Sequence, residues 1–174
     1  MKRIFLIISF FYAFIFHFKA QNKQQKWVAG ISLAGAKYTY NSRPLVYVSP
    51  RLNISRYIFK GLILDAAFAT RIGGEESYTS FDGALRYDFG RSNYNVVPYI
   101  LVGVSYLKGK VITGNSNFGI GNTFWFSQKL GMNLQVMYKY LKDDIDTQKS
   151  HIYPSVGIVY SFSHRNLNPR LWGN

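Results

Sequence analysis

The sequence predicts an all-β protein, an eight-stranded antiparallel up-and-down transmembrane β-barrel. Three observations favour this fold. Apolar and polar residues alternate with a period of two along most of the chain, and helix-period stripes are missing. Turn-forming residues separate eight such segments. Each segment has one aliphatic and aromatic face and one face of small, polar or charged residues, which is typical of a barrel whose outer surface meets lipid.

Composition narrows the class of protein. The chain of 174 residues allows one domain. It carries 21 basic and 8 acidic side chains, 18% aromatic residues and no cysteine. The missing thiols exclude disulfides, thiol nucleophiles and thiolate metal sites. The aromatic content argues against disorder, and the interleaving of polar with apolar residues argues against a protein with several helical membrane spans.

The first twenty residues predict a secretory signal peptide. Lys2 and Arg3 precede an apolar stretch over residues 4–18, Ala20 offers a small residue for cleavage, and a polar run follows. An uncleaved helical anchor is the alternative, although this stretch is short for a membrane span. We therefore expect export through the Sec route. The expected organisation is a signal peptide over 1–20, a short N-terminal lead over 21–25, a barrel over 26–162 and a short C-terminal tail over 163–174.

Removal of the signal peptide leaves 18 basic and 8 acidic residues, a charge of +10. A basic, aromatic-rich chain can bind single-stranded nucleic acid by stacking and phosphate contacts. An exported protein seldom meets nucleic acid, and the aromatic residues fall at strand spacing. We therefore expect no nucleic-acid partner.

Two segments show the alternation most clearly. In Met132–Tyr140, the even-numbered residues are apolar or aromatic and the odd-numbered ones are mainly polar. In Ile152–Phe162, the even-numbered residues are again apolar or aromatic, and the odd-numbered ones are mostly small or polar. The other expected strands are Lys26–Tyr40, Arg51–Tyr57, Leu62–Arg71, Tyr78–Phe89, Pro98–Leu107 and Asn117–Phe126.

Turn chemistry places the connections between these strands. If the first strand runs outward, the outer loops fall near residues 41–47, 72–77, 109–115 and 142–150. The inner turns then fall near residues 58–61, 90–96 and 127–131. Strands of about 9–11 residues fit a bilayer, and an even strand number closes the sheet with no edge in lipid.

Charged residues on the polar faces predict a network inside the barrel. Small residues suit the concave interior of a narrow barrel, which eight strands leave just filled with side chains. Buried charges are tolerated only when they are paired. The residues expected in this lumen network are Arg51, Asp65, Asp82, Arg86, Asp88 and Lys139.

The last strand carries a motif. The pattern Ser155-x-Gly157-x-x-Tyr160-x-Phe162 resembles the assembly signal of bacterial outer-membrane barrels. The segments 117–126 and 131–140 resemble the sixth and seventh strands of OmpA-type transmembrane domains, and 51–57 and 80–89 fit the second and fourth. The resemblance covers residues 26–162.

The resemblance implies a free-standing small barrel of the OmpX kind in the outer membrane of a Gram-negative bacterium. OmpA-type relatives continue into a peptidoglycan-binding domain, which the twelve-residue tail cannot form, so wall anchoring is not implied. The expected partners are outer-membrane lipid, lipopolysaccharide and the barrel-assembly machinery, and we expect a monomer. The tail places the motif twelve residues from the end, whereas many small barrels end on the aromatic residue itself.

Catalysis needs a separate argument, because some small barrels modify lipids. A serine esterase requires a serine, a histidine and an acid that converge in space. His151 and Ser155 share one face of the last strand but are about 13 Å apart at the usual strand rise. Ser80 or Ser105 could approach from a neighbouring strand, although nothing in the sequence requires it. We read His151 as a rim residue and His164, in the tail, as solvated.

Metal and nucleotide signals are weak. Asp143, Asp144 and Asp146 offer oxygen ligands for calcium, but a solvated loop is the simpler explanation because few ligands are on offer. Gly119 and Gly121 form a Gly-x-Gly that no helix pattern follows, so it is no nucleotide signature. The sequence therefore predicts no cofactor.

The excess of basic residues has two readings. Cations near the outer rim could meet the phosphates of anionic lipids, or they could be ordinary solubility charges on loops. The cations in question are Lys37, Arg43, Lys108, Lys110, Lys139 and Lys142.

The function that follows is a non-enzymatic outer-membrane barrel with a structural, envelope-integrity or surface-interaction role. Two alternatives stay open. One is a barrel enzyme that modifies outer-membrane lipid, and the other is a soluble periplasmic β-barrel that binds a small apolar ligand.

Overall fold

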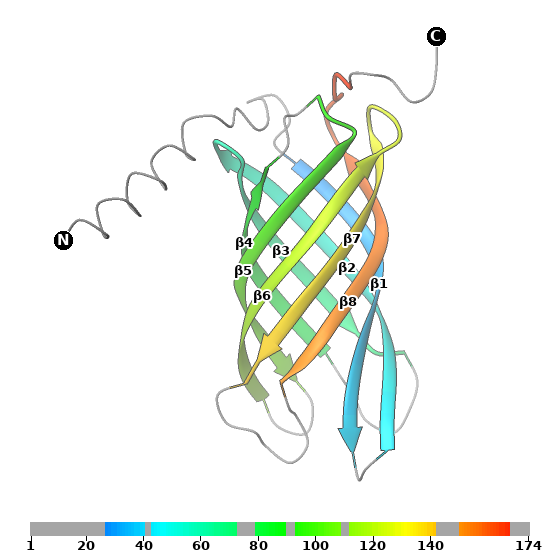
Figure 1. Cartoon of the computed structure of the whole chain (residues 1–174), viewed down its shortest axis with the longest axis vertical. Coiled ribbons are helices and arrows are strands. Elements are labelled where there is room, and N and C mark those ends of the chain that lie inside the picture. Colours follow the sequence, from blue (N-terminus) through cyan, green and yellow to red (C-terminus); the bar gives the residue numbers. More distant parts are fainter. Residues whose placement is uncertain are drawn as a thin grey trace, which may run out of the picture.

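A computed structural model describes residues 27–40, 43–72, 79–89, 93–108, 112–141 and 150–167. They form eight antiparallel strands, each paired with its sequence neighbours, and β1 pairs with β8 to close a barrel (Figure 1). The predicted eight-stranded up-and-down barrel is confirmed. The strands are β1 (Trp27–Tyr40), β2 (Arg43–Phe59), β3 (Leu62–Thr70), β4 (Thr79–Asp88), β5 (Val96–Lys108), β6 (Ile112–Trp125), β7 (Leu130–Tyr140) and β8 (His151–Ser161).

Several sequence-based predictions fall outside these residues. They are the signal peptide and lead (1–25), the end of the tail (168–174) and the aspartates at 143, 144 and 146. Within the described part of the chain, no helix is long and apolar enough to cross a membrane.

The alternation of faces is as predicted. In β7 the odd-numbered residues from Gly131 to Lys139 lie inward, and Leu134, Val136, Tyr138 and Tyr140 are exposed. The same period of two runs through β3, β5 and β8. The exposed faces carry the large aliphatic and aromatic side chains, whereas many buried positions are polar or charged. This is the reverse of a soluble barrel, whose apolar residues face inward.

The position of the first and last strand residues distinguishes the two ends of the barrel. We call the end where β1 begins and β8 ends the termini end, and the opposite end the far end (Figure 1). At the termini end, β2 and β3 are joined by Lys60 and Gly61 alone. Both have positive φ, 41° and 85°, as a two-residue type I′ turn requires, because its twist matches that of the flanking strands.

Two strands begin at least five residues before their predicted first residues. β2 begins at Arg43 rather than at residue 51, and β6 begins at Ile112 rather than at residue 117. The outer loops predicted near residues 41–47 and 109–115 are therefore wrong in part, because Pro44 and the Gly114–Asn115 pair lie in strands. A proline is tolerated in a strand where its missing N–H would not have met a partner.

Pro154 shows this rule at the seam between β1 and β8. Backbone groups of successive strand residues point to opposite neighbours. Phe162 donates its N–H to the Trp27 carbonyl at 3.2 Å, so the even-numbered residues of β8 face β1. The next hydrogen bond to β1 would need an N–H from residue 154, which proline lacks. The β1–β8 ladder accordingly ends one residue earlier, at the pair Ala34–Ser155.

Pro50 interrupts the β2–β3 ladder in the same way, on the other side of the β1–β2 hairpin. By the same alternation, the even-numbered residues of β2 face β3. The β2–β3 ladder begins at Arg51–Ala69, one residue beyond Pro50. β1 and β2 nevertheless stay paired with each other as far as Tyr40–Arg43. Beyond these two prolines the hairpin therefore leaves the barrel wall, and Figure 1 shows it running past the ends of β7 and β8.

Candidate functional site in the barrel interior

The centre of the far half of the lumen is the Asp82 carboxylate. Lys139 donates from Nζ to its Oδ1 at 2.7 Å, and Ser105 donates from Oγ to the same atom at 2.6 Å. The Ser80 hydroxyl also donates to Asp82. Arg51 Nε lies 3.6 Å from Oδ2. One buried carboxylate thus holds two cations and two hydroxyls.

The strand register explains this convergence. Asp82 on β4 stands opposite Ser105 on β5, and Asn117 on β6 stands opposite Lys139 on β7. The Asn117 amide donates to Ser105 and so links the two pairs. All of these side chains occupy inward positions of neighbouring strands, so the narrow lumen brings them together.

A second network fills the half of the lumen nearer the termini end. Arg86 Nε donates to Asp88 Oδ1 at 2.6 Å, and a terminal nitrogen of the same guanidinium donates to Thr123 Oγ1 at 3.0 Å. The guanidinium carbon lies 3.7 Å from the centre of the Tyr99 ring. Tyr99 in turn donates to side-chain carbonyl oxygens of Asn133 (2.9 Å) and Gln135 (3.1 Å).

All six side chains predicted for the lumen network are buried. Five of them take part in the ion pairs described above. Asp65 instead accepts a hydrogen bond from Ser55 Oγ at 3.1 Å. The sequence analysis did not place the neutral partners in this network, although their inward parity marked them as candidates. These partners are Ser80, Ser105, Asn117, Thr123, Asn133, Gln135 and Tyr99.

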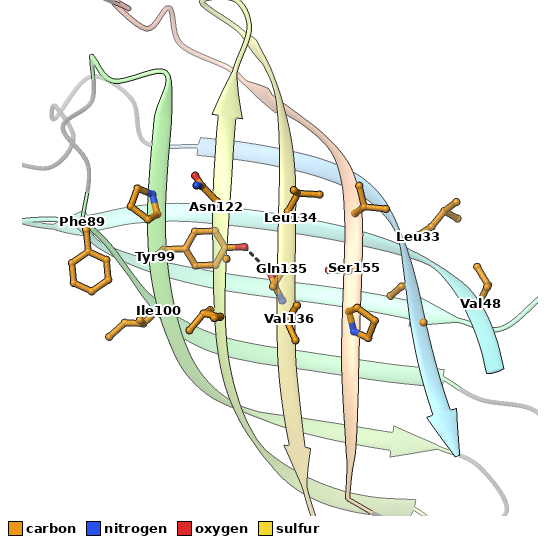
Figure 2. Close-up of a pocket in the computed structure, with 17 residues that line it drawn as sticks. Leu33, Val48, Phe89, Tyr99, Ile100, Asn122, Leu134, Gln135, Val136 and Ser155 are labelled. Carbon is orange, nitrogen blue, oxygen red and sulfur yellow. Dashed lines mark hydrogen bonds between the residues drawn. The ribbon is translucent and has the colours of Figure 1, made fainter. Parts of the chain in front are cut away.

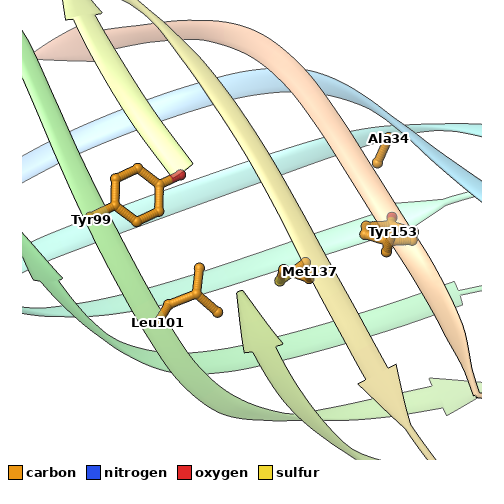
Figure 3. Packing of buried hydrophobic residues seen from close by; sticks show 5 residues of the cluster. All are labelled: Ala34, Tyr99, Leu101, Met137 and Tyr153. Carbon is orange, nitrogen blue, oxygen red and sulfur yellow. The ribbon is translucent and has the colours of Figure 1, made fainter. Parts of the chain in front are cut away.

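An apolar cluster packs in the interior beside the two networks. Figure 3 shows Tyr99, Leu101, Met137, Tyr153 and Ala34 gathered in the interior. The Lys139 ammonium lies 4.4 Å from the Tyr153 ring centre, so a cation–π contact joins the far network to this cluster. Among the described residues, these side chains fill the lumen and leave no wide channel between them.

The tail closes the termini end, which the sequence analysis did not predict. Arg165 and Leu167 are buried, with Arg165 only 1% exposed. The Arg165 guanidinium lies 4.2 Å from the Trp125 ring centre, and its backbone N–H donates to the Gln128 carbonyl at 3.0 Å. Leu167 packs in a cluster with Trp125, Val97 and Val159.

The signal for this closure was present in the sequence. Ser161, Arg165 and Leu167 continue the odd-numbered inward parity of β8, while His164 and Asn166 are exposed. Burial lowers the pKa of the Arg165 guanidinium to about 10, and the nearby Asp88 opposes that shift. Arg165 therefore remains a cation at neutral pH.

The four residues of the assembly motif lie on both sides of β8. Ser155 and Gly157 face inward, and Tyr160 and Phe162 are exposed, their ring centres 5.5 Å apart at an interplanar angle of 89°. A Cβ at Gly157 would collide with Ile31 and Ser32 of β1. Gly157 is thus required for close approach at the seam, whatever recognises the motif.

The candidate catalytic residues are arranged differently from the sequence-based interpretation. His151 is the first residue of β8 and so lies at the far rim, but its side chain is buried at an inward position opposite Lys139, with its ring 6.3 Å from that of Tyr153. Ser80 and Ser105 both donate to Asp82. Within the part of the chain that the structure describes, no three His, Asp or Glu side chains gather as a metal site would need.

One of the expected rim cations is elsewhere. Lys139 is fully buried in the lumen and cannot meet lipid phosphates, because its inward parity on β7 overrides its place near the strand end. Lys108 is exposed at the far end. The side chains of Lys37, Arg43, Lys110 and Lys142 lie outside the described residues.

The outer surface is an apolar band. A hollow of about 950 Å³ crosses β1, β8, β7, β6 and β5 on this side (Figure 2). It is lined mainly by exposed aliphatic side chains, among them Leu33, Ile100 and Val136. Aromatic residues border the band at the termini end, as Trp27, Phe59, Tyr160 and Phe162, and at the far end, as Tyr106, Tyr138 and Tyr140.

Comparison with known proteins supports the fold. No protein-family model and no curated protein sequence matches the chain. Among solved structures, Neisserial surface protein A is 16% identical with a TM-score of 0.64, and the match covers 78% of this chain and 97% of that one. The N-terminal β-barrel domain of Pseudomonas aeruginosa OprF is 14% identical with a TM-score of 0.61, covering 79% and 98%.

The outer membrane protein OprG of Pseudomonas aeruginosa is 13% identical with a TM-score of 0.60, covering 82% of this chain and 98% of that one. At such low identity the likeness defines the fold and nothing finer. The chain has the fold of the eight-stranded outer-membrane β-barrels, and the resemblance predicted from its strands is confirmed at that level.

Proposed function

We propose that this chain is a non-enzymatic outer-membrane β-barrel of a Gram-negative bacterium with a structural, envelope-integrity or surface-interaction role. The observation that carries the proposal is the outward face. Ile31, Leu52, Ile100 and Ile120 are each about half exposed or more, and many similar side chains surround the barrel. Only a lipid solvent makes such a surface favourable.

The interior supports a structural role rather than ligand binding. A small hollow of about 20 Å³ lies among Arg86, Asp88 and Thr123, which is room for roughly one water molecule. A soluble carrier of an apolar ligand needs a large apolar interior cavity. Here the described lumen holds ion pairs and packed rings, which favours a closed barrel.

The described contacts also favour a non-enzymatic role. Ser80 and Ser105 are engaged with Asp82, and Ser155 lies four residues from His151 along the same strand. The variants His151→Ala and Ser155→Ala test the lipid-modifying alternative. Unchanged lipid profiles of the envelope are expected. A changed profile in both variants would favour the enzyme.

The expected partners follow from the same proposal. Sec export delivers the chain, and the assembly machinery recognises Ser155, Gly157, Tyr160 and Phe162 at the end of β8. Outer-membrane lipid and lipopolysaccharide surround the inserted monomer.

Gel mobility of the membrane fraction, boiled against unboiled in SDS, tests the proposal. We expect the protein to sediment with the outer membrane and to change its apparent mass on heating, because a closed ladder in lipid resists SDS in the cold. A soluble protein released by osmotic shock, with no heat-dependent shift, would overturn the membrane assignment.

A further inference from the structure

Three cations at the termini end lie over outward aromatic rings. The Arg56 guanidinium is 5.1 Å from the centre of the Trp27 ring, and the Lys60 ammonium is 5.0 Å from that of Phe59. The Lys129 ammonium is 6.0 Å from the centre of the Tyr160 ring. We call Arg56, Lys60 and Lys129 the basic arc.

The basic arc follows neighbouring strands. Lys129 precedes β7, whose Leu130 stands opposite Tyr160 on β8. β8 pairs with β1, and Trp27 on β1 stands opposite Arg56 on β2. Lys60 then lies in the turn from β2 to β3. The arc therefore runs along the edge of five consecutive strands, at the level where aromatic residues border the apolar band.

No exposed carboxylate opposes the arc within the described residues. The three acidic residues described, Asp65, Asp82 and Asp88, are all buried in the lumen. Among the described residues, the termini end therefore carries exposed cations and no exposed carboxylate.

We propose that the basic arc binds the phosphate groups of anionic phospholipids in the leaflet at the termini end. This inference rests on the proposed membrane location. Aromatic side chains settle at the headgroup level, so each ring holds its cation at the height of the phosphates. The cation lies over the ring face, and the lipid tails meet the apolar band directly beyond it.

Phospholipid fits the arc better than the other occupants. A second copy of the chain would bring cations against cations. An acidic protein would match the charge but leave Trp27, Phe59 and Tyr160 without an apolar partner, whereas a lipid supplies a phosphate and a tail together. Lipopolysaccharide belongs to the outer leaflet, which the expected orientation places at the far rim, and the arc lies at the opposite end.

The test uses the full chain folded into phosphatidylcholine vesicles with and without phosphatidylglycerol. After mild detergent extraction, mass spectrometry measures which lipids stay bound. Wild-type protein is expected to retain phosphatidylglycerol in excess of its share of the vesicle, and rising salt should reduce that excess because it screens surface charges.

The variant R56Q/K129Q removes two cations of the arc, and R71Q/K108Q removes two from the far end as a matched control. Each cation near an anionic membrane surface strengthens binding, so the loss of two should weaken phosphatidylglycerol retention by about tenfold or more. The control is expected to retain the lipid as wild type does. Lys60 stays native in both, because its positive φ belongs to the turn.

Three results would overturn the inference. They are undiminished retention by R56Q/K129Q, an equal loss in R71Q/K108Q, and polyglutamate binding to the detergent-held protein as strongly as phosphatidylglycerol does. The heat-dependent gel shift, measured on the same samples, separates the two proposals. A heat-dependent gel shift without a preference for phosphatidylglycerol would refute only the role of the basic arc. No gel shift in any vesicle would refute both the membrane assignment and that role.

Discussion

The two ends of this barrel are closed by different means. At the termini end the backbone closes the barrel. Phe162 extends the β8–β1 ladder, and the tail packs Arg165 and Leu167 into the opening of the lumen. At the far end two ladders stop at Pro50 and Pro154, and the β1–β2 hairpin leaves the wall.

The difference shows where the stability of each end resides. With its ladders shortened, the far half depends on side chains, and the Asp82 cluster joins β2, β4, β5 and β7 across the lumen. The termini end has a full ladder, a short turn and the tail, so no single side chain there should matter as much.

The largest effect is expected from Asp82→Ala. The substitution leaves Lys139 and Arg51 buried without their carboxylate, which typically costs about 3–5 kcal/mol of unfolding free energy. Urea titration of the folded barrel, followed by its gel shift, measures the loss. Ser105→Ala is the control and should cost about 2 kcal/mol, because it removes the hydrogen bond to Asp82 and the one from Asn117 but no charge. If both variants lose the same amount, the carboxylate is not the centre of the far half.

Leu167→Ala tests the closure by the tail. Truncating a buried leucine costs about 2–5 kcal/mol, and we expect the lower part of that range because a tail can shift to fill the space. The neighbouring exposed residue provides the control, since Asn166→Ala should unfold as wild type does. If Leu167→Ala also unfolds as wild type does, the tail does not seal the termini end.

Gly157→Ala probes the part of the seam that is closed. The added methyl group would meet Ile31 and Ser32 of β1, and such overpacking costs roughly 1–3 kcal/mol. Gly83→Ala is the matched control, because a Cβ at Gly83 would meet nothing within 4 Å. Equal stability of the two variants in urea would show that β1 and β8 do not approach as closely as described.

Pro154→Val probes the part of the β1–β8 contact that lacks ladder hydrogen bonds. Its effect on stability should be the smallest. The new N–H would point towards β1 and extend the ladder to Gly35, a gain of about 1 kcal/mol or less. Hydrogen exchange should slow at Gly35 in this variant. Pro98→Val, at the termini end, restores an N–H beside Phe89 and should leave exchange at Gly35 unchanged. Unaltered exchange at Gly35 in Pro154→Val would mean that something other than the proline ends the ladder.

Much of this architecture was predictable because barrel strands obey one simple rule. Period-two alternation assigned the inward and outward faces of the strands, and inward parity selected Asp82, Arg86 and Lys139 as interior charges. The errors arose where a local signal has two meanings. Pro44 and Gly114 form turns in most contexts, whereas here they lie in β2 and β6.

By itself, the sequence determined the strand number, the direction of each face and the placement of charged residues on inward faces, since these depend on residue type and parity alone. Only the tertiary structure decided which charges meet, that Asp82 rather than Asp65 takes two cations, and that the tail fills one mouth. The reason is physical. Parity gives a side chain its direction, but the register between strands far apart in sequence sets the distances over which charges and rings interact.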